Sequence, residues 1–120
     1  MKIYIAGPMR GFKDFNFPAF FKTAEILRQQ GHIVFNPAER DTNAHGAERL
    51  KSETGSEDEV AHNLGYTEGR QLARECFLAD TQWICSQADA IYVLPGWEKS
   101  RGATAERALG IAIGLEIVEV

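Results

Sequence analysis

A carboxylate placed beside a phosphate-binding loop is the feature of this sequence that most directly suggests chemistry. Residues 88–106 read ADAIYVLPGWEKSRGATAE: an apolar strand, a Gly/Ser loop, and a helix expected to carry Glu106 in its first turn. The N-terminus of such a helix offers unpaired N–H groups and about half a positive charge, which favour a phosphate and an ionised carboxylate alike. Such a carboxylate can attack a sugar carbon. Alternatively, Glu106 only complements the helix dipole.

A second acidic residue, Asp80, falls on the apolar face of a predicted helix. On a helical wheel it lies near the middle of a stripe formed by Leu72, Ala73, Cys76, Phe77, Trp83 and Ile84. Burying a carboxylate is costly unless a partner compensates. Asp80 therefore either serves a ligand pocket or has a structural role, capping a loop N–H or pairing with an Arg. The lengths of its helix and of the neighbouring strand predict that it lies beneath the pocket.

Further candidates come from the loops that follow the predicted strands. Tyr4 lies in the first strand, and Arg10 follows it in the loop AGPMRG. Because the carboxyl ends of parallel strands meet at one edge of a sheet, both side chains can converge on Glu106; core packing and surface charge are the alternatives. Trp97 in PGWEKS either stacks on a nucleobase or packs its loop against the following helix.

The elements that position these residues follow from apolar runs and Gly or Pro stops. We predict strands at 3–6, 32–35, 90–94 and 117–120, and helices at 17–31, capped by Asn16, at 67–87 and at 102–113. Alternating strands and helices predict one α/β domain over residues 1–120, with a small doubly wound, Rossmann-like or flavodoxin-like parallel sheet of four or five strands flanked by helices.

Residues 41–65 interrupt this pattern. They are rich in Asn, Gly, Ser, Glu and Lys, and contain few large apolar side chains. We expect a mobile excursion there, with a short helix near 57–63. The segment is either a lid over the ligand or a solvated insertion.

Composition excludes several classes of function. The chain has 120 residues and a formal net charge of −4, which argues against binding duplex nucleic acid. No apolar stretch approaches the roughly 18 residues that span a bilayer. Cys76 and Cys85 are too far apart along one helix for a disulfide, so we expect reduced thiols and a cytoplasmic protein.

The sequence also lacks the usual signatures of metal and cofactor sites. His32, His45 and His62 are scattered and form no ligand spacing with the cysteines. A Walker lysine and a G-x-G-x-x-G motif are both missing. We therefore expect neither a metal nor a cofactor.

Three spaced motifs together resemble the nucleoside 2-deoxyribosyltransferase superfamily, and most closely its short, phage-type branch. They are IYIAGPMRG at the start, Asp80-x-x-Trp83 followed by ADAIYVLPGW, and SRGATAE leading into an Ala/Gly helix. The resemblance covers most of the chain except residues 41–65. It implies a homodimer or a higher homo-oligomer.

Within that superfamily the chain is similar to the 2′-deoxynucleoside 5′-phosphate N-hydrolases. Tyr4, Gly7 and Arg10 match the opening strand and turn of that family, Asp80 with Trp83 matches its helix Asp, and Ser100 with Glu106 matches its phosphate-contacting Ser and catalytic Glu. The turn Gly7-Pro8-Met9-Arg10 replaces a Ser-containing turn, which removes one hydroxyl and one N–H and predicts weaker phosphate binding.

The resemblance implies that the protein cleaves the N-glycosidic bond of a (deoxy)nucleoside 5′-monophosphate and releases the base. Glu106 would attack C1′ or stabilise the oxocarbenium ion, Tyr4 would orient Glu106, and Asp80 would deliver a proton to the base or contact the sugar. The implied substrate-binding residues are Gly7, Met9, Arg10, Gly11, Trp97, Ser100, Gly102 and Ala103. Base exchange, a non-catalytic nucleotide-binding module, and another phosphate-dependent small-molecule enzyme are the alternatives.

Overall fold

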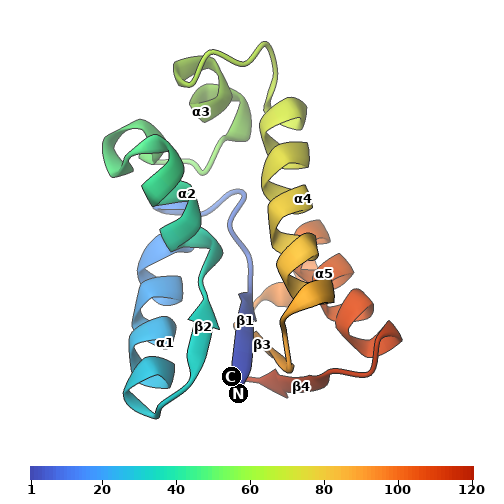
Figure 1. Cartoon of the computed structure of the whole chain (residues 1–120). Coiled ribbons are helices and arrows are strands. Elements are labelled where there is room, and N and C mark those ends of the chain that lie inside the picture. Colours follow the sequence, from blue (N-terminus) through green and yellow to red (C-terminus); the bar gives the residue numbers. More distant parts are fainter.

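Four parallel strands form the centre of the molecule (Figure 1). In the computed structural model, which describes residues 1–120, the strands are β1 (Lys2–Ala6), β2 (Ile33–Phe35), β3 (Ala90–Val93) and β4 (Glu116–Glu119). Their order in the sheet is β2-β1-β3-β4, and every neighbouring pair is parallel. In this register Tyr4 lies between Phe35 on β2 and Ile91 on β3. The predicted α/β fold with a parallel sheet is confirmed.

Helices cover both faces of the sheet (Figure 1). They are α1 (Phe17–Gln29), α2 (Pro37–His45), α3 (Glu57–Asn63), α4 (Gly69–Ser86) and α5 (Arg101–Ala112), with short 3-10 turns η1 (Lys13–Asn16), η2 (Ala47–Leu50) and η3 (Trp97–Lys99). Helix α1 lies on one side of the sheet, and α4 and α5 lie on the other. None of these helices is both long enough and apolar enough to pass through a lipid bilayer.

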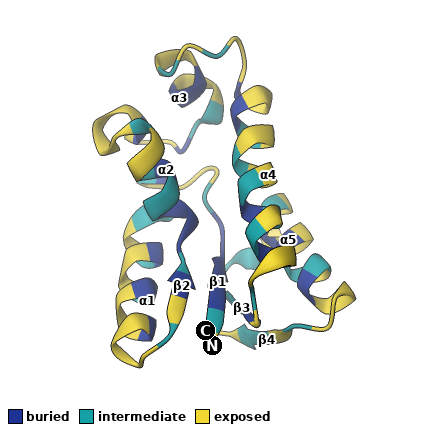
Figure 2. Ribbon diagram, viewed as in Figure 1, coloured by how far each residue is buried: buried dark blue, intermediate teal, exposed yellow.

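Alternate residues of β1 point into two separate hydrophobic cores. Ile3 and Ile5 pack with Phe20 and other residues on the α1 side, whereas Tyr4 packs with Ile84 on the α4 and α5 side. Both faces of the central strand are therefore buried, as the dark blue of β1 shows in Figure 2. This alternation aims the Tyr4 side chain at the two helices that carry the predicted acids.

The segment 41–65 contains more helix than its composition indicated. The predicted helix at 57–63 is α3, and α2 also runs into the segment, to His45. Helix α2 begins where Asn36 Oδ1 accepts a hydrogen bond from the Ala38 N–H (2.9 Å) and Pro37 takes the first helical position. Val60 on α3 is 1% exposed, so apolar burial anchors this part of the chain.

Backbone pairing also ties this segment to the loop after β1. Gly11 N donates to Gly55 O (3.0 Å) and Asp14 N donates to Ser52 O (2.6 Å). Gly55 has φ +64°, and a Cβ there would lie 2.4 Å from Phe12 O. Only glycine fits this position, so the loop after β1 and the segment before α3 pack as one unit.

The structure corrects one local prediction at the start of α1. Asn16 holds the N-cap position, but its backbone is left-handed (φ 61°) and its side chain makes no capping bond. Instead Asn16 Nδ2 donates to Pro8 O (3.1 Å), which fixes the loop after β1. The prediction that Cys76 and Cys85 form no disulfide is confirmed, since both are free.

Candidate active site

A short hydrogen bond between β1 and α5 forms the centre of the candidate site. The Tyr4 hydroxyl donates to Glu106 Oε2 at 2.5 Å. Tyr4 is 0% exposed and Glu106 is 6% exposed, so this contact is shielded from water. The predicted pairing of a tyrosine with the candidate nucleophile is therefore present in the structure.

The predicted place of Glu106 along its helix is wrong. Helix α5 begins at Arg101, because the Ser100 Oγ accepts a hydrogen bond from Ala103 N (3.2 Å) and caps it, and no acidic residue lies in the first turn. Glu106 lies in the second turn, where the dipole at a helix terminus has largely lost its effect. The contact that stabilises an ionised Glu106 is the Tyr4 hydroxyl instead.

The height of Glu106 above the sheet is fixed four residues further along α5. A Cβ on Gly110 would lie 2.4 Å from Ile91 Cδ1 on β3, closer than any real contact, and 3.1 Å from Ile117 Cδ1 on β4. The helix therefore lies as near to the sheet as it does because residue 110 has no side chain. Glu106 is carried down to Tyr4 by that close approach.

Asp80 on α4 completes a group of three side chains with Tyr4 and Glu106. Asp80 is 8% exposed, and its Oδ1 is buried without a hydrogen-bond partner. Burial, and then the negative charge of Asp41, raise the pKa of Asp80 from its usual 3.8 to about 7. Its charge also raises the pKa values of Glu106 and Tyr4, so Asp80 shares their environment.

Glu106 and Tyr4 are likewise perturbed. Burial raises the pKa of Glu106 well above its usual 4.5, the charge of Asp80 adds to the shift, and the Tyr4 hydrogen bond opposes it. Burial and the charge of Glu106 raise the pKa of Tyr4 well above 10.0. Tyr4 is therefore a permanent proton donor to Glu106 near neutral pH, while the two buried carboxylates compete for a proton.

Sequence reasoning missed a third carboxylic acid at this site, Asp41 on α2. Asp41 is 9% exposed and pairs with its neighbour Arg40 (Nη1 to Oδ1, 3.1 Å). Arg40 Nη1 also lies 3.8 Å from the Cys76 Sγ on α4. Nothing in the local sequence singles Asp41 out, because its importance comes from the approach of α2 to α4, a segment distant in the sequence.

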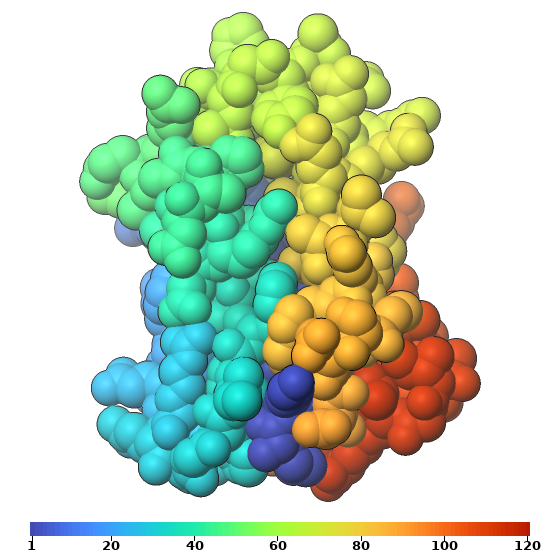
Figure 3. All heavy atoms as spheres, viewed as in Figure 1, coloured from blue at the N-terminus to red at the C-terminus, as the bar shows by residue number.

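Aromatic rings line the same side of the sheet. The Phe35 ring stacks on Tyr4 with centroids 5.5 Å apart, and Trp83 lies 5.2 Å from Phe35. The Trp of the D-x-x-W motif thus packs one helical turn from Asp80 and helps to keep water from the acids. In Figure 3 the green side chains of the α2 region meet the yellow ones of α4, with the blue N-terminal segment visible between them.

The predicted phosphate-binding residues are not gathered around these acids. Arg10 is exposed and forms an ion pair with Glu57 on α3. The Ser100 hydroxyl is engaged in capping α5. Gly102 follows it with open space around the position of a Cβ. Of the predicted residues at this end of α5, Gly102 alone is thus left unobstructed.

The other predicted binding residues have structural contacts of their own. A Cβ on Gly7 would lie 2.8 Å from Leu94 Cβ, so Gly7 lets the end of β1 pass close to β3. Met9 and Ala103 pack against the hydrophobic cores, and Gly11 donates its N–H to Gly55. The Arg107 guanidinium lies 4.5 Å from the centroid of the Trp97 ring. Trp97 therefore packs its loop against α5, which is the second of the two roles that the sequence left open.

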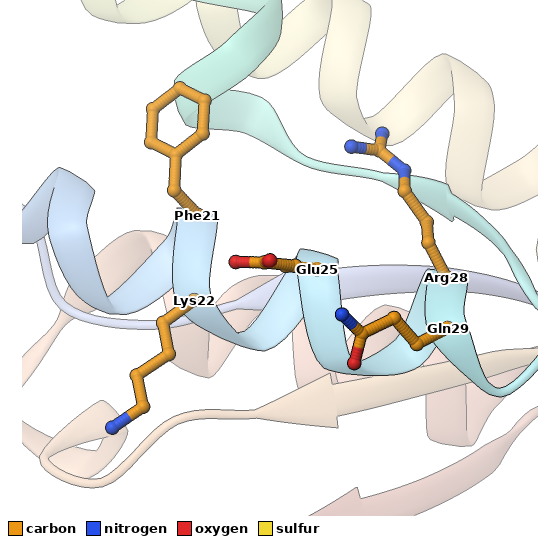
Figure 4. Close-up of a pocket in the computed structure, with 5 residues that line it drawn as sticks. All are labelled: Phe21, Lys22, Glu25, Arg28 and Gln29. Atoms are coloured by element: carbon orange, nitrogen blue, oxygen red, sulfur yellow. The ribbon is translucent and has the colours of Figure 1, made fainter.

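Two hollows in the surface lie at different places relative to the buried acids. One, of about 430 Å³, lies at the end of β2 and is lined by Phe35, Asn36 and Arg40, among others. The other, of about 630 Å³, is formed by five α1 side chains, and Figure 4 shows Lys22 and Arg28 extending in different directions there. The α1 hollow lies on the opposite side of the sheet from α5 and Glu106. No group of three His, Cys, Asp or Glu side chains is arranged to hold a metal ion.

Comparison with known proteins places the chain in a family without assigning a reaction. Residues 1–119 match the family described as "domain of unknown function (DUF4406)", and the chain belongs to that family. No curated protein and no solved structure shows a significant match. The geometry of the site and the motif resemblance are therefore the observations that bear on function.

Proposed function

We propose that the protein cleaves the N-glycosidic bond of a (deoxy)nucleoside 5′-monophosphate and releases the free base. The observation that carries this proposal is the buried Tyr4–Glu106 hydrogen bond with Asp80 beside it. A nucleophilic carboxylate, a fixed donor that orients it and a second carboxyl with a pKa of about 7 are the parts that acid-assisted displacement at a sugar carbon needs.

The three side chains have distinct roles in the proposed reaction. A Glu106 carboxylate oxygen forms an ester bond to C1′ as the bond from C1′ to the base nitrogen breaks and its electron pair passes to the base. Asp80 donates its proton to the departing base. Water then gives a proton to the Asp80 carboxylate as its oxygen bonds to C1′ and the ester bond to Glu106 breaks, which gives hydrolysis. Attack by a ring nitrogen of a second base, whose proton passes to Asp80 in the same way, would give transfer.

Protonation supports this division between the two acids. Tyr4 donates to Glu106 and favours its ionised form, whereas Asp80 Oδ1 has no donor partner and its pKa is about 7. When one proton is shared between the two carboxylates, Asp80 is thus the better place for it. The pair then presents a nucleophile and an acid together near neutral pH.

The substrate phosphate is assigned to the loop after β1 and the start of α5. Arg10 is exposed, and the region around Gly102 is open. In the proposed complex the phosphate takes Arg10 from Glu57, and the N–H groups of the first turn of α5 contribute further donors. We further propose that the protein acts in the cytoplasm, where its two free thiols stay reduced, and that it assembles as a homodimer or a higher homo-oligomer.

The test is chromatography of a panel of nucleotides and nucleosides after incubation with the protein. We expect free base from at least one 5′-monophosphate, and loss of that product in Glu106→Gln, which keeps the size and the Tyr4 contact of the side chain. Glu98→Gln, an exposed residue on η3, is the matched control and should release base at the parent rate. Equal rates for Glu106→Gln and the parent would refute the assignment of the nucleophile.

A second candidate is a module that binds nucleotides without turnover. It is favoured by the burial of Glu106, which raises the pKa of that carboxyl well above its usual 4.5, because a protonated Glu106 would not act as a nucleophile. Tight nucleotide binding measured by calorimetry, with no base released by the parent protein, would select this candidate over the enzyme.

A further inference from the structure

A chain of polar contacts joins α2 to the part of α4 that carries Asp80. Arg40 Nη1 contacts Asp41 Oδ1 at 3.1 Å and Cys76 Sγ at 3.8 Å. Cys76 lies one helical turn before Asp80, so the two side chains share a face of α4. The Arg40–Asp41 pair is therefore packed against the part of α4 that presents Asp80.

We propose that Asp41, held in place by Arg40, is a positioning residue that keeps Asp80 protonated in the resting protein. Neither Asp41 nor Arg40 touches the reacting atoms in the proposed reaction, and both act through Asp80. The catalytic part of this inference rests on the proposed function. The electrostatic part concerns the resting protein and can be tested without a substrate.

The geometry explains why Asp41 is suited to this role. Asp41 is 9% exposed and Asp80 is 8% exposed, so little water screens their repulsion. Burial raises the pKa of Asp41 above its usual 3.8, and the hydrogen bond and ion pair with Arg40 oppose that shift and favour the charged form. Asp80 Oδ1 lacks any such donor. A proton shared between these two carboxylates is therefore drawn to Asp80.

The charged and titratable groups that face Asp80 come from four elements. They are Tyr4 on β1, Arg40 and Asp41 on α2, Cys76 on α4 itself, and Glu106 on α5. Asp41 raises the pKa of Asp80, whereas Arg40 and the Tyr4 hydroxyl lower it. Removing Asp41 and removing Arg40 should therefore shift the titration of Asp80 in opposite directions.

Two shifts of opposite sign in the titration midpoint of Asp80 distinguish an electrostatic role of Asp41 from a merely structural one. Asp41→Asn removes a negative charge and should lower the titration midpoint of Asp80 by about one pH unit or more. Arg40→Gln removes the facing cation and should raise the upper midpoint of the Asp41–Asp80 pair. A structural defect alone would not produce two shifts of opposite sign.

The primary measurement is the carboxyl carbon resonance of Asp80, followed by NMR from pH 4 to pH 9 in the two variants and the parent. Glu25→Gln, on the outer side of α1, makes the same change in net charge as Asp41→Asn and should leave the midpoint in place. An unchanged midpoint in a folded Asp41→Asn variant, or shifts of the same sign in both variants, would overturn the proposal. If Asp41→Asn does not fold, a lowered or unchanged midpoint in Arg40→Gln would overturn it, and a raised one would support it.

Alkylation of the thiols gives a second readout. Burial, and then the charges of Asp41 and Asp80, raise the pKa of Cys76 to about 12. Asp41→Asn should speed alkylation of Cys76 relative to Cys85, which lies exposed on the same helix and serves as the internal reference. Arg40→Gln should slow it. An equal ratio of the Cys76 and Cys85 alkylation rates in all three proteins would contradict the proposed effect of the Asp41 charge at this face of α4.

Base release by the parent protein separates this inference from the proposed function. If the parent releases base, the alkaline limb of its pH profile should move to lower pH in Asp41→Asn. If the parent releases none while the midpoint of Asp80 still shifts as expected, the proposed function fails and the role of Asp41 stands. If base is released but the midpoint does not shift, the role of Asp41 fails alone.

Discussion

Removal of the Tyr4 hydroxyl should alter the reaction through the charge state of Glu106. Tyr4→Phe deletes the 2.5 Å hydrogen bond but keeps the ring that stacks on Phe35. The hydrogen bond favours the ionised carboxylate, and burial and the charge of Asp80 oppose it. Without the hydroxyl, the pKa of Glu106 should therefore rise further.

The size of the effect follows from the kind of hydrogen bond that is lost. A hydrogen bond to a charged group contributes about 1.5–3 kcal/mol. At about 1.4 kcal/mol per unit, the pKa of Glu106 should rise by roughly one to two units. On the acid side of the profile, kcat/KM should then fall by roughly 10- to 150-fold.

Higher pH should not restore the full rate of Tyr4→Phe. Asp80 has a pKa of about 7, so it loses its proton over the range in which Glu106 would recover its charge. The bell-shaped pH profile should become narrower as well as lower. The assay is base release across pH 4–9 by chromatography, with the fold checked by circular dichroism. An acid limb in the same place as in the parent would refute the claim that Tyr4 acts by holding Glu106 ionised.

Three further outcomes follow from the same structure. Because the pKa of Asp80 is raised in the folded protein, its protonated form contributes up to about 4 kcal/mol of stability below about pH 4, and this stability is lost as the pH rises through 7. Denaturant unfolding should therefore show that Asp80→Asn is more stabilising at pH 8 than at pH 4. Gly55→Ala should lower the free energy of unfolding by about 2 kcal/mol more than Gly65→Ala. Both glycines have a left-handed backbone, but a Cβ at residue 55 would lie 2.4 Å from Phe12 O, whereas a Cβ at residue 65 would meet nothing within 4 Å. Arg10→Ala should change stability by less than about 1 kcal/mol, because its ion pair is exposed, yet raise KM for a 5′-monophosphate and not for the corresponding nucleoside.

The sequence contained enough information for the sheet but not for every helix. Apolar runs between Gly and Pro stops located all four strands to within about two residues. The signal is continuous in β1 and β3, which are buried on both faces, and shorter in the edge strands β2 and β4. Helix α2 was missed, because PAERDTNAH has too few apolar residues to show a helical period. In the sequence, Asn36-Pro37 directly follows the strand predicted at 32–35 and indicates its end. In the structure it is also a capping residue followed by a proline at the first helical position.

For the candidate site, motif spacing found the residues but not their energetics. Tyr4, Asp80 and Glu106 were all selected, and the structure brings them together. The prediction that the α5 dipole stabilises an ionised Glu106 was wrong, because the cap at Ser100 starts the helix one turn before Glu106. Asp41 was missed, since its effect on Asp80 arises from packing between distant segments, which local sequence does not encode.

The bare Cα of Gly110 sets the spacing between α5 and the sheet, and the proposed reaction depends on that spacing. A methyl group at this position has no room against Ile91 and would lift the helix, and the carboxylate of Glu106 would rise away from Tyr4 with it. The distance between Glu106 and Tyr4 can thus be altered from outside the polar cluster, without substituting any of its acids. To change the depth at which Glu106 lies in this fold, one would therefore begin with the size of the side chains between α5 and the sheet.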